Sequence, residues 1–517
     1  MKRTLILALA CLVFVADVRT AQVQQAPSFI DELLSRYEEF HRLYNQKRRL
    51  GADVAAVDPL RQQSETAFKA GNVPLLFETV SKGIALLEGK AWDEKQRFIS
   101  SLVLDIDRQV IEPNNDLRTT LVRAFPTNAE QSFAASPTVT FEVRLDQSTA
   151  AAPTETPVAY RAPSIVIGER IRVSQETTIA TRRLRLADGV YWAIARVEVE
   201  GQVVAEVDRP VFAISNFTER VARLASLVSV IRNSTDPKVK AVANQVATPQ
   251  LQLARLAGLN KTSGDYRGNV IADLDRVEFL LAALAKGTNP LAQERGEIER
   301  AYAAPDGRPS PYRLYIPLSY NGSTALPLIV LLHGAFGDER SYFSGLYDPV
   351  VIKGEAERRG IILAAVNGGG RVSSYSGPAE EDVFQVVAAV MRDYKIDPAR
   401  IFLTGHSNGA MGTWSVAAAK PDLFAAIAPV SGGKLPQKDA ARTMLAKLKG
   451  VPALVIHGTK DSISPVANSR EFAAAAQKAG VKTEFVELEE ADHIGAVAAS
   501  FPAVMQFFTR NGKAPAR

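Results

Sequence analysis

Apolar residues recur at helical spacing in two separate stretches of the chain. In the first stretch, residues 28–125, they follow three- and four-residue steps, beginning with Phe29, Ile30, Leu33, Leu34, Tyr37, Phe40 and Tyr44. The same spacing returns over residues 216–285. Each stretch has one apolar stripe that needs a partner to bury it. We therefore expect two helical regions, 22–130 and 216–295, with the second packing on the first.

Between these stretches the hydrophobic period changes to two. Apolar and polar residues alternate over 137–214, as in the run DGVYWAIARVEVEGQVVAEVDRPVFAI. This run predicts two or three strands with a turn at Glu200 and Gly201. We expect a small antiparallel β-sandwich over 131–215, whose pattern resembles that of immunoglobulin-like accessory domains.

The last two fifths of the chain show a third pattern, in which apolar runs alternate with helical stretches. The six candidate strands are PLIVLLHG, GIILAAVNGGG, ARIFLTGHS, AAIAPVSGG, VPALVIHGTKD and KTEFVELEEADH. Continuous apolar strands are typical of a parallel sheet that is covered on both faces. We therefore predict an α/β domain with a doubly wound, mostly parallel sheet over 296–517.

Length and charge restrict the function only broadly. A chain of 517 residues is too long for one hydrophobic core, which agrees with several domains. Its net charge is only +5 and it has no long run of Lys or Arg, so we do not expect nucleic acid as a partner.

The N-terminus has the layout of a secretory signal peptide, which we place at residues 1–21. Lys2 and Arg3 precede an apolar run over residues 5–15, and this run is too short to span a bilayer comfortably. We expect a secreted or periplasmic protein without a transmembrane segment. The alternatives are a buried first helix and a lipoprotein anchor at Cys11, the only cysteine. Removal of the leader beyond Cys11 excludes disulfides and cysteine metal sites.

A candidate nucleophile lies at the end of the third strand of the last region. Ser407 is the central residue of a G-x-S-x-G pentapeptide, Gly405 to Gly409, between an apolar strand and a helix. A serine needs a histidine as base and a carboxylate to orient that base. Asp461 follows the fifth strand and His493 follows the sixth, and functional groups gather at the carboxyl ends of such strands. Asp492, beside His493, is the alternative acid.

The same chemistry needs donors for a tetrahedral oxyanion. The N–H of Asn408 is one candidate, and Ala335 or Phe336 in LLHGAFGDE supplies the other. Arg371 and Tyr375 lie in the loop after the second strand. They are candidate substrate contacts, with simple loop packing as the alternative. We expect no metal site and no organic cofactor.

With these motifs in place, residues 300–511 resemble the α/β-hydrolase superfamily, in particular its compact secreted esterases. The matching segments are SPYRLYIPLSY, LPLIVLLHG, GHSNGAMGTW, PDLFAAIAPVSGG and VIHGTKDSISP. They are most similar to polyhydroxybutyrate depolymerase-like and feruloyl esterase-like proteins. Dienelactone hydrolases and the prolyl-oligopeptidase catalytic domain are more distant matches. Residues 22–295 carry no such resemblance.

The resemblance implies an exported serine carboxylic-ester hydrolase that uses no cofactor. Its implied substrates include polymeric and polysaccharide-linked esters. The chain departs from the disulfide-bearing members because it lacks their cysteines. A serine peptidase of the prolyl-oligopeptidase type is one alternative, because the same triad cleaves amides. A non-catalytic binding or scaffold protein on a hydrolase fold is another.

Overall fold

The computed structural model describes residues 27–113, 115–127, 133, 135, 137–146, 158–161, 165–166, 175–179, 186–261, 266, 268–370 and 373–512. The chain divides into two compact units. The first is Met1–Thr235 with Gln252–Lys286, and the second is Asp236–Leu251 with Gly287–Arg517. The predicted signal peptide, 1–21, and Cys11 lie outside the described residues. None of the helices within the described part of the chain is both long and apolar enough to cross a membrane.

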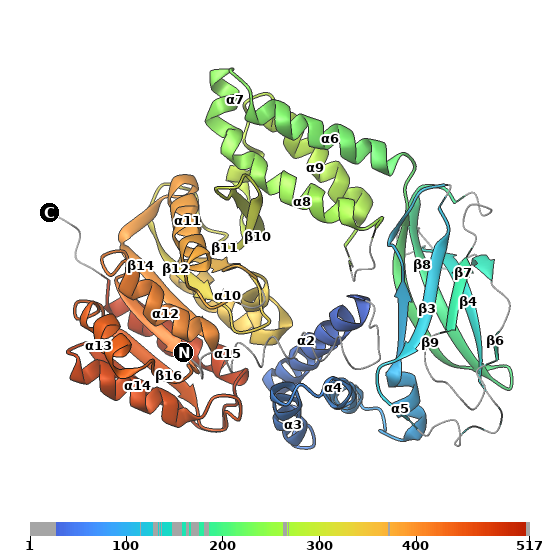
Figure 1. Ribbon diagram of the computed structural model, residues 1–517, viewed down its shortest axis with the longest axis horizontal. Coiled ribbons are helices and arrows are strands. Elements are labelled where there is room, and N and C mark those ends of the chain that lie inside the picture. The colour runs from blue at the N-terminus through green and yellow to red at the C-terminus, as the bar shows by residue number, and fades with distance from the viewer. Residues whose placement is uncertain are drawn as a thin grey trace. The chain divides into compact units, whose positions relative to one another are not determined.

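The first unit begins with a small helical cluster (Figure 1). Its helices are α2 (Pro27–Arg49), α3 (Asp58–Lys69), α4 (Val73–Leu87) and α5 (Glu94–Ser101). Phe40, Phe77 and Val80 are completely buried in the cluster, together with Val103 and Phe125 from the segment that follows the helices. The apolar stripe of α2 is therefore covered by its own neighbours.

The segment after α5 is β-structure, which corrects the predicted helical region 22–130. Residues 102–123 contain β1 (Leu102–Ile106), β2 (Val110–Ile111) and β3 (Leu117–Arg123). Phe98, Leu102 and Ile106 follow a four-residue step, which is also a multiple of the strand period of two. The hydrophobic pattern was therefore ambiguous at this point.

Two sheets share one apolar core in the rest of this segment. One has the order β1-β3-β7 and the other β2-β9-β8-β4-β5, with β6 also paired to β4. The additional strands are β4 (Thr138–Leu145), β5 (Val158–Arg161), β6 (Ile165–Val166), β7 (Gln175–Ile179), β8 (Gly189–Val199) and β9 (Gln202–Ala213). The predicted turn joins β8 to β9, with positive φ angles at Glu200 (52°) and Gly201 (77°). The sandwich thus begins at residue 102 rather than 131.

The later helical region also finds a local partner. The helices α6 (Phe217–Arg232) and α9 (Val270–Leu284) pack against each other in the first unit, and α8 (Ala247–Gly258) lies between them in sequence. Within the described residues, the structure gives no support to packing of this region on the first helices. It also moves a boundary, because α7 (Pro237–Val242) and η3 (Ala243–Val246) belong to the second unit.

The second unit contains an eight-stranded sheet in the order β10-β11-β13-β12-β14-β15-β16-β17. Its strands are β10 (Gly296–Ala303), β11 (Pro309–Ile316), β12 (Leu326–Leu332), β13 (Ile362–Val366), β14 (Ile396–His406), β15 (Ala426–Val430), β16 (Ala453–Gly458) and β17 (Thr483–Leu488). β10 pairs antiparallel with β11, and β11 pairs antiparallel with β13. The strands β12 to β17 run parallel to one another. The predicted doubly wound, mostly parallel α/β sheet is confirmed.

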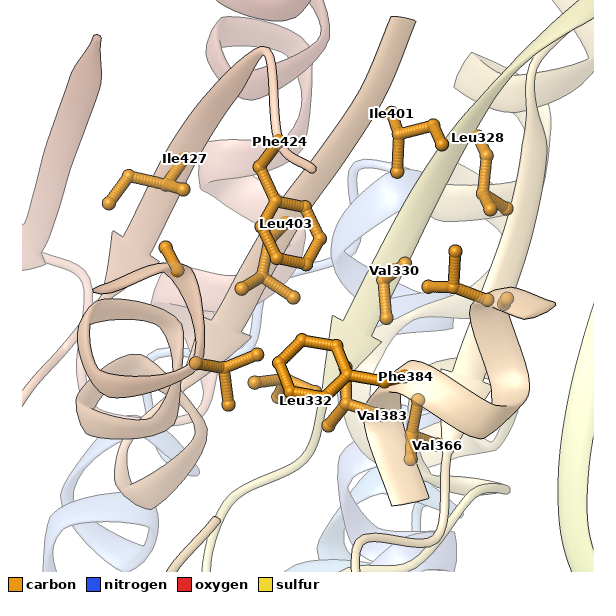
Figure 2. Close-up of a cluster of buried hydrophobic side chains, with 14 of the residues drawn as sticks. Leu328, Val330, Leu332, Val366, Val383, Phe384, Ile401, Leu403, Phe424 and Ile427 are labelled. Atoms are coloured by element: carbon orange, nitrogen blue, oxygen red, sulfur yellow. The ribbon is translucent and has the colours of Figure 1, made fainter. Parts of the chain in front are cut away.

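Helices cover both faces of this sheet. They are α10 (Pro349–Arg359), α11 (Pro378–Asp393), α12 (Asn408–Ala419), α13 (Lys438–Ala446), α14 (Val466–Lys478) and α15 (Gly495–Arg510). Alternate residues of β12 face opposite cores, and both cores consist of buried apolar side chains. Figure 2 shows one of them, where Val330 and Leu332 lie near Val383 and Phe384 of α11. Burying each such side chain contributes about 1.5–3 kcal/mol, which explains the continuous apolar strands.

Candidate active site

Ser407 occupies a sharp turn between β14 and α12. Its backbone angles are φ 56° and ψ −115°, a conformation that a residue with a side chain rarely adopts. A Cβ on Gly405 would lie 2.2 Å from the carbonyl oxygen of Gly409, and one on Gly409 would lie 2.1 Å from that of Leu332. Both positions therefore require glycine, and the turn lifts the serine to the carboxyl edge of the sheet.

The predicted acid and base are in contact at the same edge. His493 Nδ1 lies 2.7 Å from Asp461 Oδ2. The other oxygen, Asp461 Oδ1, accepts hydrogen bonds from the backbone N–H groups of Ile463 (3.0 Å) and Ser464 (2.7 Å). Burial opposes ionisation of this carboxyl, but the hydrogen bonds from histidine and backbone donors outweigh it and hold the pKa of Asp461 well below its usual range. Asp461 is thus an anion that accepts from the Nδ1 side of His493.

Asp492, the alternative acid, has a different role in the structure. Its Oδ1 accepts a hydrogen bond from the backbone N–H of Gly495 at 2.7 Å, where α15 begins. A carboxylate at this position satisfies one of the free N–H groups of a helix N-terminus. The structure therefore pairs His493 with Asp461.

His406 connects the serine turn to the base, a contact that the sequence did not reveal. Its Nε2 lies 2.9 Å from the backbone carbonyl oxygen of His493, so this nitrogen carries the proton and donates. Its Nδ1 must then accept, and it does so from the hydroxyl of Tyr347 at 2.8 Å. The rings of His406 and His493 lie 4.5 Å apart between centroids. Burial and the nearby His493 lower the pKa of His406 well below its usual range, so the ring is neutral.

The loop after β12 passes directly beside Ser407. A Cβ added to Gly334 would lie 3.2 Å from Ser407 Cβ, which is tighter than an ordinary contact, so glycine favours this approach. Ala335 and Phe336, the two candidate oxyanion donors, follow at once, and Phe336 has a positive φ of 62°. Asn408 is the first residue of α12, where the backbone N–H has no partner within the helix. The candidate donors thus belong to the two segments that adjoin the nucleophile.

Of the two candidate substrate contacts, Arg371 and Tyr375, the structure describes only Tyr375. Tyr375 is completely buried, and its hydroxyl donates to the carbonyl oxygen of His333 at 3.1 Å. Its ring packs where a side chain on Gly412 would otherwise fit. These contacts match the alternative of simple loop packing, in which Tyr375 supports the loop after β13. Arg371 lies outside the described residues.

A doubly wound sheet that carries a serine turn and an Asp–His pair at its carboxyl edge defines the α/β-hydrolase fold. The comparisons with known proteins agree, since residues 379–509 match the model of the phospholipase/carboxylesterase family.

Among curated proteins, the chain is similar to a probable acetylxylan esterase A of Aspergillus flavus. The two are 27% identical over 161 residues, which cover 29% of this chain and 52% of that protein. It is also similar to poly(3-hydroxyalkanoate) depolymerase C of Paucimonas lemoignei, with 45% identity over 49 residues, 10% of this chain and 12% of that one. The chain thus spans about half, or less, of the length of these relatives.

Among solved structures, the chain is similar to the fluorophosphonate-binding serine hydrolase F of Staphylococcus aureus. The TM-score is 0.35 and the sequence identity 18%, over 42% of this chain and 98% of that one.

Proposed function

We propose that this protein hydrolyses carboxylic esters through an acyl-enzyme intermediate, with Ser407 as nucleophile. The contact of 2.7 Å between His493 and the buried, ionised Asp461 carries the proposal, together with the strained turn at Ser407. The names of the curated relatives support the ester class, since both are named for enzymes that cleave esters.

In this mechanism Ser407 Oγ attacks the ester carbonyl and passes its proton to Nε2 of His493. Asp461 holds the imidazole in the tautomer that leaves Nε2 free to accept, because Nδ1 carries the proton that the carboxylate binds. The N–H of Asn408 and that of Ala335 or Phe336 stabilise the oxyanion. His493 then returns its proton to the leaving alcohol, and water repeats the sequence on the acyl-enzyme.

The substrate class we favour is an acyl ester carried by a polymer or a polysaccharide. The printed names of the two relatives, an acetylxylan esterase and a polyhydroxyalkanoate depolymerase, support this class. A signal peptide over residues 1–21 would deliver the enzyme outside the cytoplasm.

The decisive test is Ser407→Ala, with Ser415→Ala as the matched control on the same helix. In a serine protease the loss of the nucleophile costs on the order of a million-fold in kcat, so we expect Ser407→Ala to abolish hydrolysis of aryl acetate. Among the described residues, Ser415 Oγ bonds to carbonyl groups of its own helix, and its replacement should leave the rate unchanged. Retention of more than about a hundredth of the activity in Ser407→Ala would refute the proposal.

Two further assays separate this function from the alternatives. A fluorophosphonate should label the wild-type protein and not Ser407→Ala, whereas a scaffold protein would not be labelled at all. Turnover of an aminoacyl anilide faster than aryl acetate, acetylated xylan or polyhydroxybutyrate would favour a peptidase.

A further inference from the structure

A second histidine contacts the carboxylate that orients His493. His457, the residue before the last in β16, is completely buried, and its Nε2 lies 3.0 Å from Asp461 Oδ2. The same oxygen accepts from His493 Nδ1 at 2.7 Å. The acid of the site therefore lies between two imidazoles that come from different segments of the chain.

The surroundings of His457 fix which nitrogen carries its proton. Nε2 faces two acceptors, Asp461 Oδ2 and the carbonyl oxygen of Ser464 at 2.8 Å. Neither can donate, so Nε2 must be the protonated nitrogen. Nδ1 is then an acceptor, and the hydroxyl of Ser469 lies 2.7 Å away to donate to it. The ring is thus held from both sides in a single tautomer.

With His457 included, Asp461 receives four donors. Two backbone N–H groups bind Oδ1 and two imidazole N–H groups face Oδ2. A carboxylate has about four acceptor positions, so this one is saturated and cannot rotate without losing a partner. The same donors disfavour its protonation.

We propose that His457 is a positioning residue, which fixes the orientation and the charge of Asp461 and thereby aligns His493 for the reaction. The proposal rests on the ester-hydrolase function proposed above. His457 does not contact the substrate; it acts through Asp461. The other titratable groups near this cluster are His406 of β14, which is neutral, and Glu487 of β17, which is bound to Arg470 on the surface.

Two substitutions test the role, because they differ in where they place an amide. In His457→Asn the amide reaches the level of Nδ1 and leaves nothing to donate to Asp461. In His457→Gln the side chain is longer by one methylene group, so its amide can donate from the position of Nε2. We expect His457→Asn to lower kcat about 10- to 100-fold with KM changed less than about twofold, and His457→Gln to restore most of the loss.

The pH profile separates positioning from a general structural role. Without the donor of His457, Asp461 becomes a stronger acceptor for a protonated His493. The midpoint of the acid limb of kcat/KM should then move to higher pH in His457→Asn, by about half a unit or more, and stay near the wild-type value in His457→Gln. Equal loss of activity in both variants with an unshifted profile would overturn the proposal.

Nitrogen-15 NMR of histidine-labelled wild-type protein gives a readout that needs neither a variant nor an active enzyme. We expect the His457 signals to show a protonated Nε2 and an unprotonated Nδ1. The opposite tautomer would contradict the proposal even if the variants did not fold. If the proposed ester-hydrolase function were wrong, Ser407→Ala would retain activity while the His457 tautomer stayed as expected. The two proposals can therefore fail separately.

Discussion

The imidazole of His406 donates a hydrogen bond from Nε2 to the backbone carbonyl of His493, 2.9 Å away. His406 directly precedes the candidate nucleophile, and His493 is the candidate base. The turn that presents the hydroxyl is thus bonded to the loop that presents the imidazole. Tyr347 orients the ring of His406 by donating to its other nitrogen.

This relationship predicts a clear effect of Tyr347→Phe. The substitution leaves Nδ1 of a buried histidine without a donor, which costs about 1–3 kcal/mol of stability. Because the ring also holds the backbone of His493, we expect kcat to fall about tenfold. Tyr342→Phe is the matched control, since its buried hydroxyl bonds to Leu332 instead. The measurement compares the stability and kcat of the two variants. Equal kcat values would contradict a role of the His406–His493 contact in catalysis.

The second prediction concerns how the stability of the fold depends on pH through the buried residue His41. His41 on α2 is buried between Tyr37 and Phe40, and within the described residues neither of its ring nitrogens has a hydrogen-bond partner. Burial, with a smaller effect of the nearby Arg61, lowers the pKa of His41 well below its usual range. Below about pH 6.5 the unfolded chain therefore binds a proton that the folded chain does not.

Stability should accordingly fall as the pH drops below about 6.5, by up to about 1.4 kcal/mol per pH unit from this residue. His41→Leu removes that contribution and leaves no unpaired polar group. We expect the variant to gain stability relative to wild type, and to gain more at pH 5 than at pH 8. Urea denaturation at both values measures this difference. An equal change at the two pH values would show that His41 does not titrate in this way.

The third prediction concerns Glu32, which joins α2 to the sandwich. It is buried and contacts Arg36 (2.7 Å) and Arg209 of β9 (2.6 Å). Burial alone would raise its pKa, but the two guanidinium groups outweigh this and lower the pKa of Glu32 to about 2. Its contribution to stability is therefore complete above about pH 4.5 and is lost as the pH falls towards 2.

We expect Glu32→Gln to cost about 3–5 kcal/mol at pH 7, because it leaves the buried Arg209 and the partly buried Arg36 without their anion. The cost should shrink markedly near pH 2.5. Glu39→Gln is the control on the same helix, since its pair with Arg42 is exposed and contributes about 0–1 kcal/mol. Hydrogen exchange in peptides that cover α2 and β9 reports the change. A similar effect of both substitutions would argue against the buried network.

The sheet of the second unit could be predicted from the sequence because a strand that is covered on both faces has an unbroken apolar run. The contact of Asp461 with His493 could be predicted for a related reason, since both residues follow neighbouring parallel strands, which end at one edge. Topology alone brings them together.

The remaining errors have physical causes. The period of four in Phe98, Leu102 and Ile106 fits both a helix and a strand, and the partner across the core decides between them. The role of Tyr375 depends on the gap above Gly412, which only the fold creates. His406 ends β14, and its partners Tyr347 and His493 are distant in sequence. His457 lies next to the end of β16, and its partners are near in sequence but are brought together by an irregular turn. Such side-chain contacts have no periodic signal.

The last prediction concerns whether a lid covers the active site, and it rests on the segment between β15 and β16. In the structure this interval contains one helix, α13, which serves as the crossover that two parallel strands require. The interval thus leaves no additional element that could cover Ser407, which is half-buried. Where this interval supplies no lid, a lipid or polymer surface has no lid there to open.

We therefore expect the rate to follow the concentration of a soluble aryl ester smoothly through its micelle threshold. The measurement is initial rate against total ester on both sides of that threshold, using Ser407→Ala to subtract the uncatalysed background. Polymer-bound esters should be accepted for the same reason, since no lid from this interval blocks their approach to Ser407. A sharp rise in rate at the threshold would instead show that a mobile element covers the site. Deletion of residues 438–446 would not be informative there, because α13 connects two strands of the sheet. The loop over residues 335–347, which follows the close approach of Gly334 to Ser407, would then be the first candidate.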